Sequence, residues 1–144
     1  MRQVLMAMLA LLLFTMMGRP AVPVEARAGD VAVTVTYTGK GKVDDTHEIW
    51  VFLFDSPDIT RGARPIAVQR LMQSGAVATF KGVTSDPIYL AVAYDEKGDY
   101  DGNSGPPPAG TPIAMHAKDG KNLPITPGPT AKIRMTFGEA RRME

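Results

Sequence analysis

The chain has 144 residues, of which 44% are hydrophobic and 22% are charged, a balance typical of a soluble globular protein. Its 16 Lys and Arg residues and 15 Asp and Glu residues give a formal net charge of +1, which argues against a nucleic-acid binder. The sequence contains no cysteine. This excludes four features for these residues: disulfides, thiolate zinc sites, a catalytic thiol and a lipid-modified cysteine.

Residues 1–28 have the features of a secretory signal peptide. Arg2 supplies the positive start, residues 4–17 form an apolar run too short to span a membrane, and Ala26-Arg27-Ala28 fits the small-x-small pattern of a cleavage site. We therefore predict a signal peptide over 1–28 and one domain over 29–144, with no transmembrane segment after cleavage. The lack of disulfides favours the bacterial periplasm or cell surface as its location.

The remaining residues show strand patterns. Apolar residues alternate with polar ones in residues 31–37 and 131–137, which predicts strands with one buried face. Residues 49–54 are apolar throughout and predict a central strand covered on both faces. Further strands are predicted in the following segments: residues 65–72, 76–83 and 87–94.

Glycine and proline punctuate the chain, and helical periodicity is nearly absent. A single antiparallel sheet would leave the strand at residues 49–54 half exposed, so we predict an all-β fold, a two-sheet antiparallel β-sandwich of seven to eight strands. Gln73-Ser74-Gly75, between two of the weaker strands, predicts a hairpin turn.

The connection at residues 95–112 is long, acidic and rich in glycine and proline, and such loops are usually functional or disordered. Asp99, Asp101 and Asn103 follow one another at a spacing of two, as in oxygen-rich calcium loops, and Asp95 adds a carboxylate. These four residues are the predicted Ca²⁺ ligands. The pattern departs from the EF-hand at positions six and twelve, and the alternative is a solvated acidic turn.

A second hypothesis is a glycan- or protein-binding module with an aromatic strand face. Trp50, Phe52 and Phe54 share one face of their strand and would form a stacking platform if exposed. Ala91 and Ala93 on another strong strand leave room for large rings, so we favour packing of the aromatic row in a core.

No enzyme motif is present. The only imidazoles belong to His47 and His116, neither lies in a recognisable catalytic pattern, and Ser104 does not occupy a nucleophile elbow. We predict no catalytic residues and no cofactor other than calcium, with a small hydrolase as the less favoured alternative.

The segments VAVTVTYTG, HEIWVFLFD, IYLAVAYDEKGDYDGNSGPPPAG and AKIRMTFG together resemble the transthyretin-like and carboxypeptidase-regulatory-like β-sandwich domains of bacterial exported proteins. The resemblance implies a seven- or eight-stranded sandwich without an assigned activity. Transthyretin-like hydrolases end in a Tyr-Arg-Gly-Ser tail, which this sequence lacks. The sequence therefore predicts an exported, non-catalytic binding or structural accessory module whose partner is an envelope protein or a glycan and not a nucleic acid.

Overall fold

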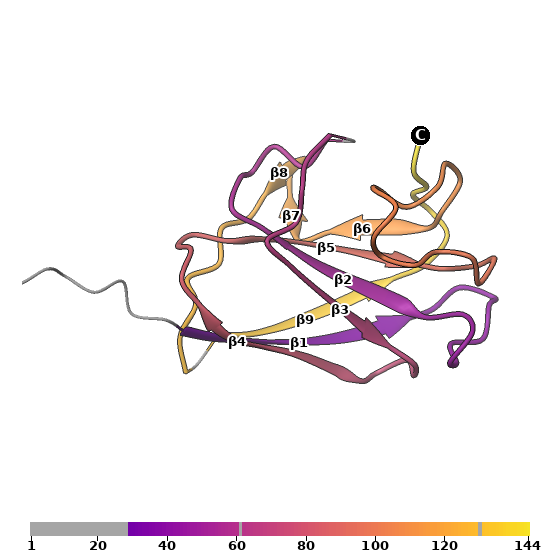
Figure 1. Ribbon diagram of the computed structural model, residues 1–144, viewed down its shortest axis with the longest axis horizontal. Helices are drawn as coiled ribbons and strands as arrows, with labels where there is room; N and C mark the ends of the chain where they lie inside the picture. The colour runs from indigo at the N-terminus through magenta and orange to yellow at the C-terminus, as the bar shows by residue number, and fades with distance from the viewer. Residues whose placement is uncertain (1–28, 61, 130) are drawn as a thin grey trace, which may run out of the picture.

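The computed structural model describes residues 29–60, 62–129 and 131–144, so the predicted signal peptide lies outside the described residues. Within them the chain forms strands and no helix (Figure 1), and therefore no helix there is long and apolar enough to cross a membrane. The strands, in chain order, are β1 (Gly29–Tyr37), β2 (Ile49–Phe54), β3 (Ala67–Leu71), β4 (Val77–Val83), β5 (Tyr89–Tyr94), β6 (Ile113–Met115), β7 (Ala117–Lys118), β8 (Lys121–Asn122) and β9 (Lys132–Phe137).

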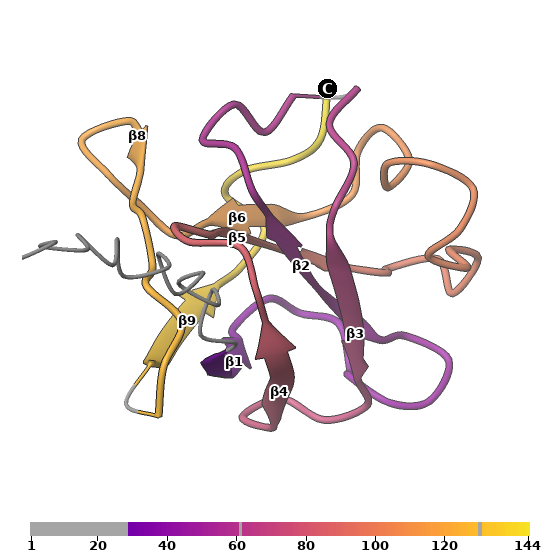
Figure 2. The same cartoon turned by 60° about the vertical axis from the view of Figure 1, so that its left-hand side comes forward.

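Two main sheets stack on each other, which confirms the predicted all-β sandwich. The smaller sheet has the strand order β4-β1-β9, and the larger has the order β3-β2-β5-β6. Figure 1 shows the two layers, and the view in Figure 2 shows the strands of the two layers crossing at an angle. The strands β7 and β8 form a separate small hairpin.

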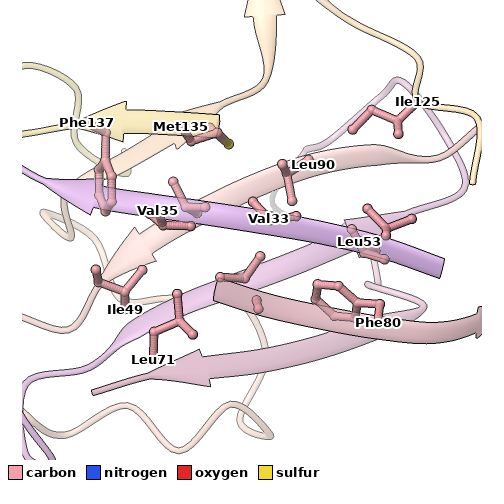
Figure 3. Packing of buried hydrophobic residues seen from close by; sticks show 14 of the residues in the cluster. Val33, Val35, Ile49, Leu53, Leu71, Phe80, Leu90, Ile125, Met135 and Phe137 are labelled. Atoms are coloured by element: carbon pink, nitrogen blue, oxygen red, sulfur yellow. The ribbon is translucent and has the colours of Figure 1, made fainter. Parts of the chain in front are cut away.

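The main core lies between the two sheets. Alternation in β1 places Val31, Val33 and Val35 on the inner face, each with no exposed surface. From the larger sheet, Ile49 and Leu53 meet them, also fully buried. Figure 3 shows Val33, Val35, Ile49 and Leu53 between the layers, where burial of apolar surface supplies most of the stabilisation.

The strand β2 is central, as its continuous apolar run predicts. It pairs with β3 on one side and β5 on the other, both antiparallel, and every one of its residues is buried. One of its faces belongs to the main core, so the opposite face must be covered by something other than the second sheet.

Two features of the topology differ from the sequence prediction. The predicted hairpin around Gln73-Ser74-Gly75 is wrong, because β3 and β4 belong to different sheets and the connection crosses from one layer to the other. The smaller sheet is also not purely antiparallel, since β1 and β9 pair in parallel over Ala32–Tyr37 and Lys132–Phe137. Strand patterns fix which residues are buried but not which strand becomes a neighbour.

Candidate functional site

The outer face of the larger sheet, the face turned away from the main core, carries a second apolar cluster. Trp50, Phe52 and Phe54 of β2 are only 7%, 5% and 7% exposed. On β5, Ala93 lies opposite Trp50, and Ala91 lies opposite Phe52. Small residues facing large rings make the packing possible, and the predicted burial of the aromatic row is confirmed. An exposed stacking platform is not formed.

Two loops cover this outer face. One is the 55–66 loop, which contributes Ile59 and Ala63 to the cluster, and the other is the acidic loop, residues 95–112, which contributes Tyr100. The ring of Tyr100 stands edge-on to Trp50, with the ring centroids 5.0 Å apart. In Figures 1 and 2 both loops and the C-terminus lie on the same side of the larger sheet.

A glycine permits the close approach of the acidic loop to the sheet. Gly102 has φ +75° and lies directly against the six-membered ring of Trp50, where a Cβ atom would collide with the ring. Both the left-handed backbone and the lack of a side chain are therefore required here. The indole Nε1 of Trp50 is buried and has no hydrogen-bond partner among the described residues.

Between the two loops, above this buried row, lies a groove of about 1000 Å³. Phe52, Phe54 and Met115 are among its apolar floor residues, and Ala63 and Tyr100 lie in its walls. The charged residues that line it are Arg64, Arg141, Arg142 and Glu144. A concave apolar surface with a few polar groups is the usual form of a ligand-binding site.

The tail, residues 141–144, closes one side of the groove by pairing as an extended segment. The Ile113 N–H donates to the Arg141 carbonyl at 3.0 Å, and the N–H groups of Gly110 and Met143 donate to Met143 and Thr111 at 2.8 and 2.9 Å. These backbone bonds attach the tail to the end of the acidic loop and to β6.

Arg142 fastens the tail further. Its guanidinium donates to Glu96 Oε2 at 2.9 Å and to the Gly110 carbonyl at 2.6 Å, and lies 3.6 Å from Glu139. The hydrogen bond from Arg142 lowers the pKa of Glu96 below its ordinary value. Because both partners are partly exposed, the pair contributes little to stability and mainly fixes the position of the tail.

Of the four predicted calcium ligands, Asp95 has an internal structural role. Its side chain is buried, with 6% of the residue exposed, and accepts hydrogen bonds from the backbone N–H groups of Gly98, Asp99 and Tyr100 at 2.9, 3.3 and 3.0 Å. The carboxylate thereby curls the start of the acidic loop and positions Tyr100 over the outer face.

Asp101 caps a second turn in the same loop. Its Oδ1 accepts from the Ser104 hydroxyl and from the backbone N–H groups of Asn103 and Ser104, the latter two both at 2.9 Å. The Ser104 hydroxyl is the largest cause that lowers the pKa of the exposed Asp101 carboxyl. The predicted ligands Asp99 and Asn103 are exposed.

In the part of the chain that the structure describes, no three His, Cys, Asp or Glu side chains are grouped so that they could hold a metal ion. Calcium binding by Asp95, Asp99, Asp101 and Asn103 stays a prediction.

The two histidines lie apart from the groove lining. His47 Nδ1 is 3.1 Å from Asp44 Oδ1, which also accepts from the backbone N–H groups of Thr46 and His47. These backbone bonds, led by the one from His47, lower the pKa of Asp44. Together with the backbone bonds, the contact between His47 and Asp44 closes a turn. His116 contributes backbone hydrogen bonds to Leu90 and Leu123.

The acidic loop that the sequence indicates as the site forms one wall of the groove, but the sequence gives no sign of the other walls. Arg64, on the 55–66 loop, and the tail lie in no motif, and neither has a strand or helix pattern that would indicate a shared surface. The signal available in the sequence was that the 55–66 segment is a long connection. It is marked as one by a proline at position 57, a glycine at 62 and a proline at 65.

Comparison with known proteins identifies no family. No family model matches the chain, and no curated protein matches it. One solved structure is similar: an alternative pilotin from the type II secretion system of Vibrio cholerae, 15% identical, covering 76% of this chain and 92% of that chain with a TM-score of 0.44. A likeness at this level does not define a shared family, so the transthyretin-like resemblance stays a prediction.

Proposed function

We propose that the domain is an exported, non-catalytic binding module and that the groove on the outer face of the larger sheet is its binding site. The observation that carries this proposal is the groove itself. Its volume of about 1000 Å³ is at the upper end of the range of ligand pockets, and its floor is apolar and aromatic.

The packing of the groove supports a site that exists before a ligand arrives. Its floor consists of paired strands, because β2 and β5 are hydrogen-bonded along their whole length and β6 pairs with β5. Its walls formed by the acidic loop and the tail are held by the three hydrogen bonds to Asp95 and by the backbone pairing of the tail. A preformed cavity binds a ligand with little loss of conformational entropy.

Export is the part of the proposal that rests on the sequence. The positive start, the short apolar run and the small residues before position 29 are the three features of a signal peptide in the required order. A fusion of residues 1–28 to a reporter that is active only in the bacterial periplasm tests this part. Activity of the fusion, and loss of activity when the apolar run is interrupted by charges, are expected.

Titration with a neutral apolar dye, N-phenyl-1-naphthylamine, tests the binding site. We expect its fluorescence to rise on addition of the full chain, because the dye enters the apolar groove. Ala63→Phe and Val68→Phe each put a larger side chain into the groove from a position that is not buried, so each is expected to reduce dye binding at least fivefold. Ala117→Phe makes the same change at an exposed position outside the groove and serves as the control.

Circular dichroism checks that each variant keeps the β fold. If both groove variants are folded and bind the dye as the control does, the groove is not the site and the proposal is wrong.

A further inference from the structure

We infer that the groove takes a single-chain amphiphile with an anionic head group, the apolar chain lying on the floor and the head group at the rim. This inference rests on the proposed function, because it names the class of ligand for the same site. It depends on two properties of the groove: the distribution of charge along its rim and the lack of backbone partners on its floor.

The rim carries two arginines that form an ion pair with no carboxylate in the described residues. Arg64, Arg141, Arg142 and Glu144 are the charged residues that line it. Arg142 is already paired with Glu96 and Glu139. In the described part of the chain, neither Arg64 nor Arg141 has a carboxylate within 4 Å.

The two arginines come from different walls, Arg64 from the 55–66 loop and Arg141 from the tail, and both are exposed. A guanidinium is weakly hydrated and presents several N–H donors to a carboxylate or phosphate. Two such groups at the edge of an apolar groove complement a ligand whose charge is negative and confined to one end.

The floor favours a hydrocarbon chain over a peptide. An extended peptide in the groove would bury its own N–H and C=O groups, and each of these needs a hydrogen-bond partner. The backbone groups of the floor are occupied, because β5 lies between β2 and β6 in a paired sheet. Thr60, Tyr100 and Asn103 are the uncharged polar side chains on the lining, and the Tyr100 hydroxyl already donates to the Gly105 carbonyl. A hydrocarbon chain has no such requirement and gains from contact with the partly exposed Ile59 and Met115.

Competition between the neutral dye and three dodecyl compounds tests the inference. Dodecanoate, dodecanol and dodecyltrimethylammonium share one chain and carry a negative, a neutral and a positive head group. Each is added to the full chain below the concentration at which it forms micelles. We expect dodecanoate to displace the dye about tenfold more effectively than dodecanol and the cation to be the weakest. The preference for dodecanoate should shrink as salt is raised, since exposed charges are screened.

Arginine variants locate the head group. Arg64→Gln and Arg141→Gln are each expected to weaken dodecanoate binding about threefold, and the double variant should remove the preference over dodecanol. Arg134→Gln is the matched control, because Arg134 is exposed on β9 in the other sheet. If Arg134→Gln weakens dodecanoate binding as much as the two rim variants do, the assignment of the head group to the rim is wrong.

The outcomes separate this inference from the proposed function. If the three compounds displace the dye equally, the groove binds apolar ligands but the anionic head group is wrong. If a soluble peptide of alternating Leu and Glu displaces the dye and dodecanoate does not, the ligand is a peptide and the inference fails. Binding only to phosphatidylglycerol vesicles would likewise overturn it, in favour of a membrane surface. If nothing binds, the proposed function fails as well.

Discussion

Replacement of Asp95 by alanine is expected to destabilise the domain by about 3 kcal/mol. The carboxylate is buried and accepts three backbone N–H hydrogen bonds at 2.9, 3.0 and 3.3 Å. A hydrogen bond to a charged group contributes about 1.5–3 kcal/mol, and the longest of the three contributes least. The donors are only partly buried, so water replaces some of what is lost, and the total falls below the sum of the three.

Urea denaturation followed by the fluorescence of Trp50, the single tryptophan of the chain, measures this loss. With a slope of about 1.5 kcal/mol per molar urea, the unfolding midpoint should fall by about 2 M. Asp95→Asn keeps one acceptor oxygen without the charge and should lose roughly half as much.

Asp99→Ala is the matched control for this prediction. Asp99 is exposed and lies in the same loop, so its replacement removes the same charge without removing a buried acceptor, and a change within about 0.5 kcal/mol is expected. If Asp95→Ala costs less than about 1 kcal/mol, or if Asp99→Ala costs as much, the carboxylate of Asp95 does not organise the acidic loop.

Three further predictions concern the same region. Gly102→Ala places a Cβ atom against the indole ring at φ +75°. In urea denaturation it should lower the free energy of unfolding by about 2 kcal/mol more than Gly105→Ala, where φ is +103° and the space around the new atom is open. Equal losses of unfolding free energy would contradict the close packing. Arg142 lowers the pKa of Glu96. The pair therefore stabilises the folded state at pH values above the ordinary glutamate pKa of about 4.5. This stabilisation is lost as the pH falls through the lower pKa that Glu96 has in the folded state. Glu96→Gln should therefore be slightly less stable than the native chain at pH 7, by under about 1 kcal/mol, and equally stable at pH 2.5 in urea titrations; a difference that persists at pH 2.5 would refute the assignment. Calcium binding at the predicted ligands should raise the unfolding free energy by about 2.7 kcal/mol at a free concentration of 100 times Kd, and Asp101→Ala should abolish the rise; a melting temperature that is the same in calcium and in chelator removes the hypothesis.

Much of the fold was predictable because side-chain alternation reports burial directly. The period of two in residues 31–37 placed the three valines of β1 in the core, and the continuous apolar run of β2 correctly indicated a strand covered on both faces. The alanines at positions 91 and 93 correctly indicated that large rings would pack beside them.

Strand neighbours were harder to predict. A parallel pair such as β1 and β9 leaves the same alternation in the sequence as an antiparallel pair, so the pattern does not distinguish them. The segment between β3 and β4 has the residues of a hairpin turn but crosses between layers, because Leu71 and Phe80 both point into the shared core from opposite sheets.

The groove was the least predictable feature. Two connections and the tail converge over one sheet face to form it, and this convergence depends on tertiary packing that has no local signature. The acidic residues of the 95–112 loop suggested a metal ion, yet Asp95 and Asp101 accept hydrogen bonds from the loop's own backbone. The same residue types serve turns and calcium sites, and only the geometry separates the two uses.

The parallel pairing of β1 with β9 has a consequence for the order in which the domain can assemble. The first strand of the smaller sheet acquires its last neighbour from residues 132–137, about a hundred positions later in the chain. That sheet therefore stays incomplete until residue 137 is available, and a contact between such distant segments slows folding. A nascent chain released before residue 132 would present β1 with one bare edge, the kind of edge on which β proteins aggregate.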